Sequence, residues 1–175
     1  DALLFAKKAT DAQRFLAMVS PARQGAFTAR VAMQLRWPDA EARYGAVMGQ
    51  VVADPGLMMD RARYLRDGGN DGYARQLFAR EHHFTNRPAD PDRFLEMMLL
   101  LAGGAVDERQ YQTAYNISRQ VDDLFAPGTD MAAQPYDVRD KYTSLTWLAG
   151  TIAFGPLNRP ASAVAMYDRY SRGGR

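Results

Sequence analysis

Three prolines stand directly after a residue that can cap a helix, in the pairs Ser20-Pro21, Asp54-Pro55 and Asp90-Pro91. A proline at the first helical position loses no helical hydrogen bond, and its fixed φ already suits a helix. The Ser or Asp before it can accept hydrogen bonds from the free backbone N–H groups of the first turn. The three pairs therefore predict that helices begin at these prolines.

Glycines predict where helices end, because glycine adopts the left-handed conformation of a helix C-cap without strain. The expected ends lie at Gly68-Gly69, Gly103-Gly104 and Gly155-Pro156. Asp107, followed three residues later by Gln110, resembles a capping box and predicts a further helix start.

Between these signals, apolar residues recur three and four positions apart, as they do on the buried face of a helix. The residues Ala, Leu and Met number 52, whereas Val, Ile and Thr number 19. Unbranched side chains keep more rotamer freedom in a helix than β-branched ones, so the composition also favours an all-α fold. We expect about nine helices, one of them with an apolar face over 44–52, and longer links over 82–89 and 126–135.

Two stretches of the chain share a pattern. Residues 61–79 and 148–170 each read as a helix, a turn with Asn70 or Asn158, and a second helix with a small residue, Ala74 or Ala163. Helix pairs that repeat in this way are typical of an α-solenoid of tetratricopeptide-like units. We therefore predict one all-α domain over residues 1–175, built as a right-handed α-superhelix.

Charge and composition exclude several functional classes. The net charge is +2, which is too small an excess to indicate nucleic-acid binding. The chain contains no cysteine, so it has neither disulfides nor thiolate metal sites. The longest apolar run, over 97–106, is interrupted by two glycines and is too short to span a membrane.

Candidate catalytic groups are sparse. His82 and His83 are neighbours, so their side chains point in different directions on a helix and cannot bind one metal ion together; we expect a capping or solvent-exposed role in a loop. The acidic pairs Asp122-Asp123 and Asp90-x-Asp92 fall where helix ends favour Asp. The sequence contains no Gly-x-Ser-x-Gly motif and no P-loop lysine. We predict no catalytic residue, no metal site and no cofactor.

Several sequence blocks occur in a characteristic order: DPGL at 54–57, DRARYLR at 60–66, NRPADP at 86–91, RQYQTAY at 109–115, YTSLTWLAG at 142–150 and NRPA at 158–161. With these blocks, the chain from residue 54 onward resembles the superhelical region of soluble lytic murein transglycosylases. Residues 1–53 match less distinctly. These enzymes are periplasmic lyases of Gram-negative bacteria that cleave the MurNAc–GlcNAc bond of peptidoglycan and form 1,6-anhydro ends.

The resemblance implies a non-catalytic, periplasmic scaffold. In the family, stacked helix pairs form the superhelix, and a separate lysozyme-like domain C-terminal to it carries the catalytic Glu in a Glu-Ser dipeptide. None of the four glutamates in this chain precedes a serine, so no catalytic role can be transferred. The chain begins at Asp1 without an initiator Met, and we expect a piece of a longer protein whose partners are peptidoglycan strands and that catalytic domain.

Aromatic residues are the candidates for contact with glycan, since sugars bind to aromatic surfaces flanked by polar groups. The candidates are Tyr64, Tyr73, Tyr111, Tyr115 and Tyr142, and a core position between helix layers is the alternative for each. We expect Trp147 in the core and Gly150 at a close helix approach. The other motif residues with an expected structural role are Arg109, Ala114, Leu148 and Ala163.

Two further expectations concern partners. An isolated solenoid segment exposes its end faces, which predicts a homodimer formed through them. The alternative function is a free-standing tetratricopeptide-like adaptor that binds protein segments in its concave groove.

Overall fold

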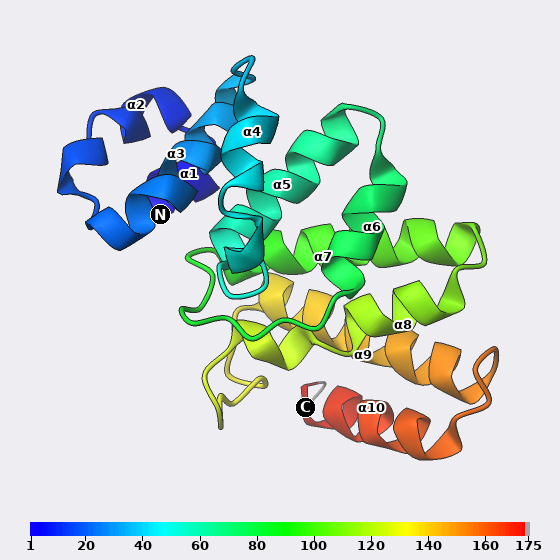
Figure 1. The fold of residues 1–175 in the computed structure, drawn as a ribbon. Coiled ribbons are helices and arrows are strands. Elements are labelled where there is room, and N and C mark those ends of the chain that lie inside the picture. The colour runs from blue at the N-terminus through cyan, green and yellow to red at the C-terminus, as the bar shows by residue number, and fades with distance from the viewer. Residues whose placement is uncertain (174–175) are drawn as a thin grey trace. The chain divides into compact units, whose positions relative to one another are not determined.

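The computed structural model describes residues 1–173, and all regular structure among them is helical, which confirms the predicted all-α class (Figure 1). The α-helices are α1 (Ala2–Phe5), α2 (Ala9–Gln13), α3 (Pro21–Leu35), α4 (Ala40–Gly45), α5 (Pro55–Asp67), α6 (Asp71–Ala79), α7 (Pro91–Asp107), α8 (Tyr111–Ser118), α9 (Tyr136–Phe154) and α10 (Pro160–Gly173). Three short 3₁₀ turns, η1 (Leu16–Met18), η2 (Met48–Gln50) and η3 (Val121–Leu124), lie between them.

The predicted helix starts at proline are confirmed, because α3, α5 and α7 begin at Pro21, Pro55 and Pro91. At α5 the cap is complete: the Asp54 carboxylate accepts the backbone N–H groups of Gly56 and Leu57 at 2.9 and 3.0 Å. The start of a helix is a local property, which is why the sequence predicts it well.

Two predicted boundaries are wrong. Helix α7 continues through Gly103-Gly104 to Asp107, so these glycines do not end it. A Cβ at Gly104 would lie 3.1 Å from Nη1 of Arg75, so this glycine makes room for a side chain packed against the helix. Asp107 is the last residue of α7, and Gln110 rather than Asp107 precedes α8, so the capping box does not form.

The apolar face predicted over 44–52 does not lie on one helix. Helix α4 ends at Gly45, and only the 3₁₀ turn η2 follows before α5. Gly45 and Gly49 lower the helix propensity of this segment, because glycine loses the most backbone freedom on folding. The predicted long links over 82–89 and 126–135 are confirmed, since both lie outside the α-helices.

Four helix ends share one backbone motif that we did not predict from the sequence. A residue in the left-handed conformation is followed by an N–H that donates to a carbonyl five residues earlier, the hydrogen bond of a Schellman motif. The left-handed residues are Lys7, Arg36, Gly69 and Arg109, with φ values of 58°, 56°, 75° and 58°. The bonds run from Lys8 to Leu3, Trp37 to Ala32, Asn70 to Leu65 and Gln110 to Ala105, at 2.7 to 2.9 Å.

The chain divides into two compact units. The first unit consists of residues 1–74 and 83–90, and the second unit of residues 75–82 and 91–175. The chain therefore passes between the units three times, and α6 begins in the first and ends in the second. The return segment 83–90 is held in the first unit by hydrogen bonds from the His83 and Thr85 N–H groups to the carbonyls of Val52 and Ala53, both at 3.0 Å.

The first unit is built around α3, which packs against α2, α4 and α5. Its apolar core contains Leu4, Ala9, Ala12 and Val31. A buried ion pair joins α3 to α5: Nε of Arg30 lies 2.6 Å from Oδ2 of Asp60, and the two side chains are 2% and 0% exposed.

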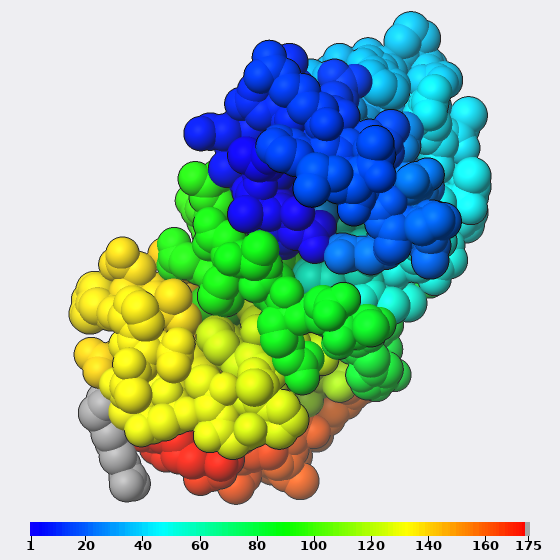
Figure 2. Space-filling view, turned by 90° about the vertical axis from the view of Figure 1, so that its left-hand side faces the viewer, coloured from blue at the N-terminus to red at the C-terminus, as the bar shows by residue number. Residues whose placement is uncertain are grey.

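The second unit contains two helix hairpins, α7–α8 and α9–α10, and α9 packs against α7, α8 and α10 (Figure 1). Small residues fill the centre, among them Ala114 and Ala163, so the helices approach closely. The predicted role of Gly150 is confirmed, because a Cβ there would lie 2.7 Å from Cε1 of Tyr167. Figure 2 shows the segment after η3 (yellow) beside the end of α10 (red) on the surface of this unit.

Candidate functional site

The five tyrosines predicted to contact glycan are divided between the two units. Tyr64 and Tyr73 belong to the first unit, and Tyr111, Tyr115 and Tyr142 to the second. Tyr73 is 65% exposed, so its ring is open to solvent. The ring of Tyr64 is covered in part by the guanidinium groups of Arg36 and Arg61, whose Cζ atoms lie 4.9 and 5.6 Å from its centroid.

The three predicted tyrosines of the second unit are buried or partly buried. Tyr115 is buried in the apolar core, and Tyr111 packs against the same core. Tyr142 is buried, and its hydroxyl donates to Oδ1 of Asp122 at 2.7 Å. A sugar ring needs one open aromatic face, and the ring of Tyr115, buried in the core, offers none in this conformation.

Trp147 corrects a prediction, because it is 52% exposed rather than part of the core. Helix α9 turns by about 100° per residue. Its buried side contains Leu145, Ala149 and Ile152, which places position 147 about half a turn away. This spacing was a signal in the sequence that could have identified Trp147 as a surface residue. Its neighbour Leu148 is the partly buried one and packs against the core.

Trp147 forms an aromatic cluster with two residues of α10, the partly buried Tyr167 and the exposed Tyr170; we call these three residues the aromatic platform. The ring centroids of Tyr167 and Tyr170 lie 5.3 and 5.1 Å from that of Trp147. Tyr170 is 39% exposed, and Tyr167 is held against α9 by the space at Gly150. The platform thus lies on two packed helices, and its rings combine an apolar surface with the polar N–H and O–H groups of Trp and Tyr.

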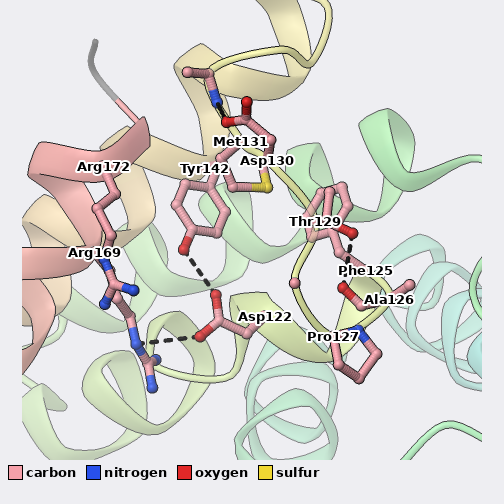
Figure 3. Close-up of a pocket in the computed structure, with 12 residues that line it drawn as sticks. Asp122, Phe125, Ala126, Pro127, Thr129, Asp130, Met131, Tyr142, Arg169 and Arg172 are labelled. Atoms are coloured by element: carbon pink, nitrogen blue, oxygen red, sulfur yellow. Dashed lines mark hydrogen bonds and ion pairs between the residues drawn. The ribbon is translucent and has the colours of Figure 1, made fainter.

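A second feature is a cavity of about 590 Å³ that we call the loop cavity. It lies between the loop 125–132 and side chains of α9, α10 and η3 (Figure 3). Its lining contains Asp122, Tyr142, Arg169, Arg172 and all residues of that loop.

Asp122 organises one wall of the loop cavity. Its carboxylate accepts the Tyr142 hydroxyl and forms an ion pair with Nε of Arg169 at 3.1 Å (Figure 3). Arg169 also donates from Nη1 to the carbonyl of Arg119 at 3.0 Å. Burial and the neighbouring Asp122 carboxylate both raise the pKa of Tyr142, so its hydroxyl stays a donor well beyond neutral pH.

The acidic residues expected at helix ends have partners far away in the sequence. Asp123 pairs with Nδ1 of His82 at 2.8 Å, and Asp92 pairs with Nζ of Lys141 at 2.6 Å. His83 is exposed, whereas His82 is buried, contrary to a solvent-exposed role. Among residues 1–173, no group of three acidic or histidine side chains is placed to bind a metal ion.

Comparison with known proteins identifies no relative: no family model, no curated protein and no solved structure matches this chain. Over the described residues, every helix falls short of the length and apolar character that crossing a membrane requires.

Proposed function

We propose that this chain is a non-catalytic helical scaffold that engages the glycan strands of peptidoglycan. The observation that carries the proposal is the aromatic platform of Trp147, Tyr167 and Tyr170. A sugar ring carries C–H groups on its faces and hydroxyl groups on its rim. The exposed rings of Trp147 and Tyr170, which lie on two packed helices, suit such a ligand, because aromatic rings stack on the sugar faces and lose little conformational freedom on binding.

The resemblance to the superhelical region of lytic transglycosylases supplies the context for this binding. On that resemblance the chain is one right-handed superhelical domain of tetratricopeptide-like helix pairs in the periplasm. The hairpins α7–α8 and α9–α10 are compatible with such units. The parent enzyme would cleave MurNAc–GlcNAc bonds with its lysozyme-like domain, and this chain would hold the strand or position that domain.

The test is retention of the purified protein on isolated peptidoglycan sacculi. We expect that Trp147→Ala lowers retention about tenfold, because a central aromatic residue of a binding surface contributes more than 1 kcal/mol. Trp147 is half exposed, so its removal leaves the core of the second unit intact.

The matched control is Tyr136→Ala. Tyr136 lies at the start of the same helix and is 70% exposed, but it is not part of the platform. This variant should bind sacculi as the unchanged protein does. Equal retention of the Trp147→Ala variant and the unchanged protein would exclude the platform as the glycan contact.

The alternative is a free-standing adaptor that binds protein segments, which is favoured by the succession of helix pairs with short links. An adaptor of this kind predicts no retention on sacculi at moderate salt. An enzyme complete in this chain would clear the turbidity of a peptidoglycan suspension, and we expect no clearing.

A further inference from the structure

We propose that the loop cavity binds the terminal carboxylate of a short peptide with small apolar side chains. This inference rests on the proposed function for the source of the peptide, since the stem peptides of peptidoglycan carry free carboxylates. It concerns a part of the second unit that the aromatic platform does not include, and it is carried by the two arginines and the apolar wall of the cavity.

Arg169 is the anchored arginine. Its Nε and Nη1 atoms are fixed by Asp122 and by the carbonyl of Arg119. The guanidinium is therefore oriented before any ligand arrives, which lowers the entropic cost of binding. A ligand carboxylate can bind at its Nη2, and a charge-assisted hydrogen bond of this kind is stronger than one between neutral groups.

Arg172 lies three residues further along α10 and lines the same cavity. Residues at this spacing share one side of a helix, so both guanidinium groups can meet one carboxylate. Arg172 is paired with Asp168 at 2.5 Å, but both side chains are more than half exposed. Such a surface pair contributes only a few tenths of a kcal/mol, so a ligand carboxylate can replace Asp168.

The loop wall favours an apolar ligand body. Phe125, Pro127 and Met131 line the cavity. The Asp130 carboxylate accepts a hydrogen bond from the backbone N–H of Ala132 at 3.0 Å, which holds the loop. The volume of about 590 Å³ lies within the range of small-molecule sites and suits a peptide of two or three residues.

The experiment is a calorimetric titration of the whole chain with the tripeptide diacetyl-Lys-D-Ala-D-Ala and with the same peptide amidated at its C-terminus. We expect saturable binding of the free acid and about tenfold weaker binding of the amide, since the amide loses the charge-assisted bonds. Arg172→Ala should weaken binding of the acid only about twofold, because Arg172 is more than half exposed and its ion pairs contribute a few tenths of a kcal/mol. Arg169→Lys should also weaken it, because lysine keeps the charge but lacks the planar fork of donors.

Arg159→Ala is the matched control: it removes the same charge from an exposed position just before α10, outside the cavity, and should leave the affinity unchanged. Unchanged circular dichroism and melting temperature would show that each variant is folded. Equal binding of acid and amide, no saturable binding, or unchanged affinity in both cavity variants would overturn the inference.

Three further outcomes identify the source of the peptide and separate this inference from the proposed function. If the corresponding L-Ala-L-Ala peptide binds and the D-peptide does not, the cavity takes a protein terminus, and the assignment of its ligand to peptidoglycan stem peptides is overturned. If the protein is retained on sacculi and this retention depends on Trp147, but the tripeptide does not bind, the inference fails and the proposed function stands. If the tripeptide binds but the protein is not retained on sacculi, the carboxylate site stands and the proposed function fails.

Discussion

Arg109 adopts a backbone conformation that disfavours side chains, with φ of 58°. An L-residue in the left-handed region brings its Cβ close to its own carbonyl oxygen, which glycine avoids. The conformation persists because the next N–H, that of Gln110, donates to the carbonyl of Ala105 at 2.7 Å and closes the end of α7. The strain at this residue is thus balanced by the hydrogen bond that follows it.

We therefore expect Arg109→Gly to stabilise the protein by about 1 kcal/mol, because it removes the steric cost and keeps the hydrogen bond. Arg109 is exposed, so Arg109→Ala removes the side chain at little cost and keeps the strain; its stability should match that of the unchanged chain. Urea unfolding of the three proteins measures both effects. A lower free energy of unfolding for the glycine variant would contradict this account.

Individual residues also show what the sequence can and cannot predict. Asp54 caps α5 through atoms two and three residues away, so its role follows from local sequence. Gly104 predicts a helix end from local sequence, but its actual role depends on Arg75 of another helix, which packs against it. The partners of Asp122 are Tyr142 and Arg169, which only the folded chain brings together. The loop cavity was for this reason beyond prediction, whereas helical periodicity could have placed Trp147 on the surface.

At the scale of elements, α3 and α5 are joined by the buried pair of Arg30 and Asp60. Asp60 also accepts a hydrogen bond from Nε2 of Gln34 at 2.8 Å. Gly56 makes room for the guanidinium group of Arg30, since a Cβ at Gly56 would lie 2.2 Å from Nη1 of Arg30. Burial raises the pKa of Asp60, and the positive charge of Arg30 opposes that shift. The two helices are therefore matched by charge as well as by apolar contacts.

Breaking this pair from one side removes the main partner of a buried charge and leaves only weaker ones: Arg30 keeps the partly exposed Asp1 at 2.8 Å, and Asp60 keeps Arg63 at 3.5 Å. We therefore expect Arg30→Met or Asp60→Leu alone to lower the free energy of unfolding by about 3 kcal/mol, the lower end of the range for a buried ion pair. The double variant should lose much less than the sum of the two, because both charges are then absent. A double-mutant cycle by denaturant unfolding measures this coupling, and simple additivity would show that the pair does not act as a unit.

The control for this cycle is Asp67→Ala at the end of α5. Asp67 pairs with Arg36 at 2.8 Å, but both side chains are well exposed. Because solvent screens such pairs, this variant should lose less than about 1 kcal/mol.

At the scale of the whole molecule, the passage of the chain between two units determines which fragments can fold. The second unit includes residues 75–82, which precede the return segment of the first. Phe78 in this stretch stacks on Phe94 with ring centroids 5.1 Å apart, and His82 pairs with Asp123. The second unit is thus incomplete without its early segment.

We expect a fragment of residues 75–175 to unfold in one cooperative thermal transition, and a fragment of residues 91–175 to melt at a lower temperature or without cooperativity. The second fragment loses Phe78, and removal of a buried phenylalanine costs about 3 to 5 kcal/mol. Differential scanning calorimetry compares the two. Equal transitions for both fragments would show that residues 75–90 do not stabilise the second unit.

The return segment 83–90 also determines whether the first unit can fold from the amino-terminal part of the chain alone. Division of the chain at the unit boundary between Ala74 and Arg75 would leave the segment on the carboxyl-terminal piece, although its hydrogen bonds to Val52 and Ala53 complete the first unit. The first unit is then complete only when the two pieces of the chain associate again. The amino-terminal portion is therefore not a module that recombination could transfer to another protein by itself.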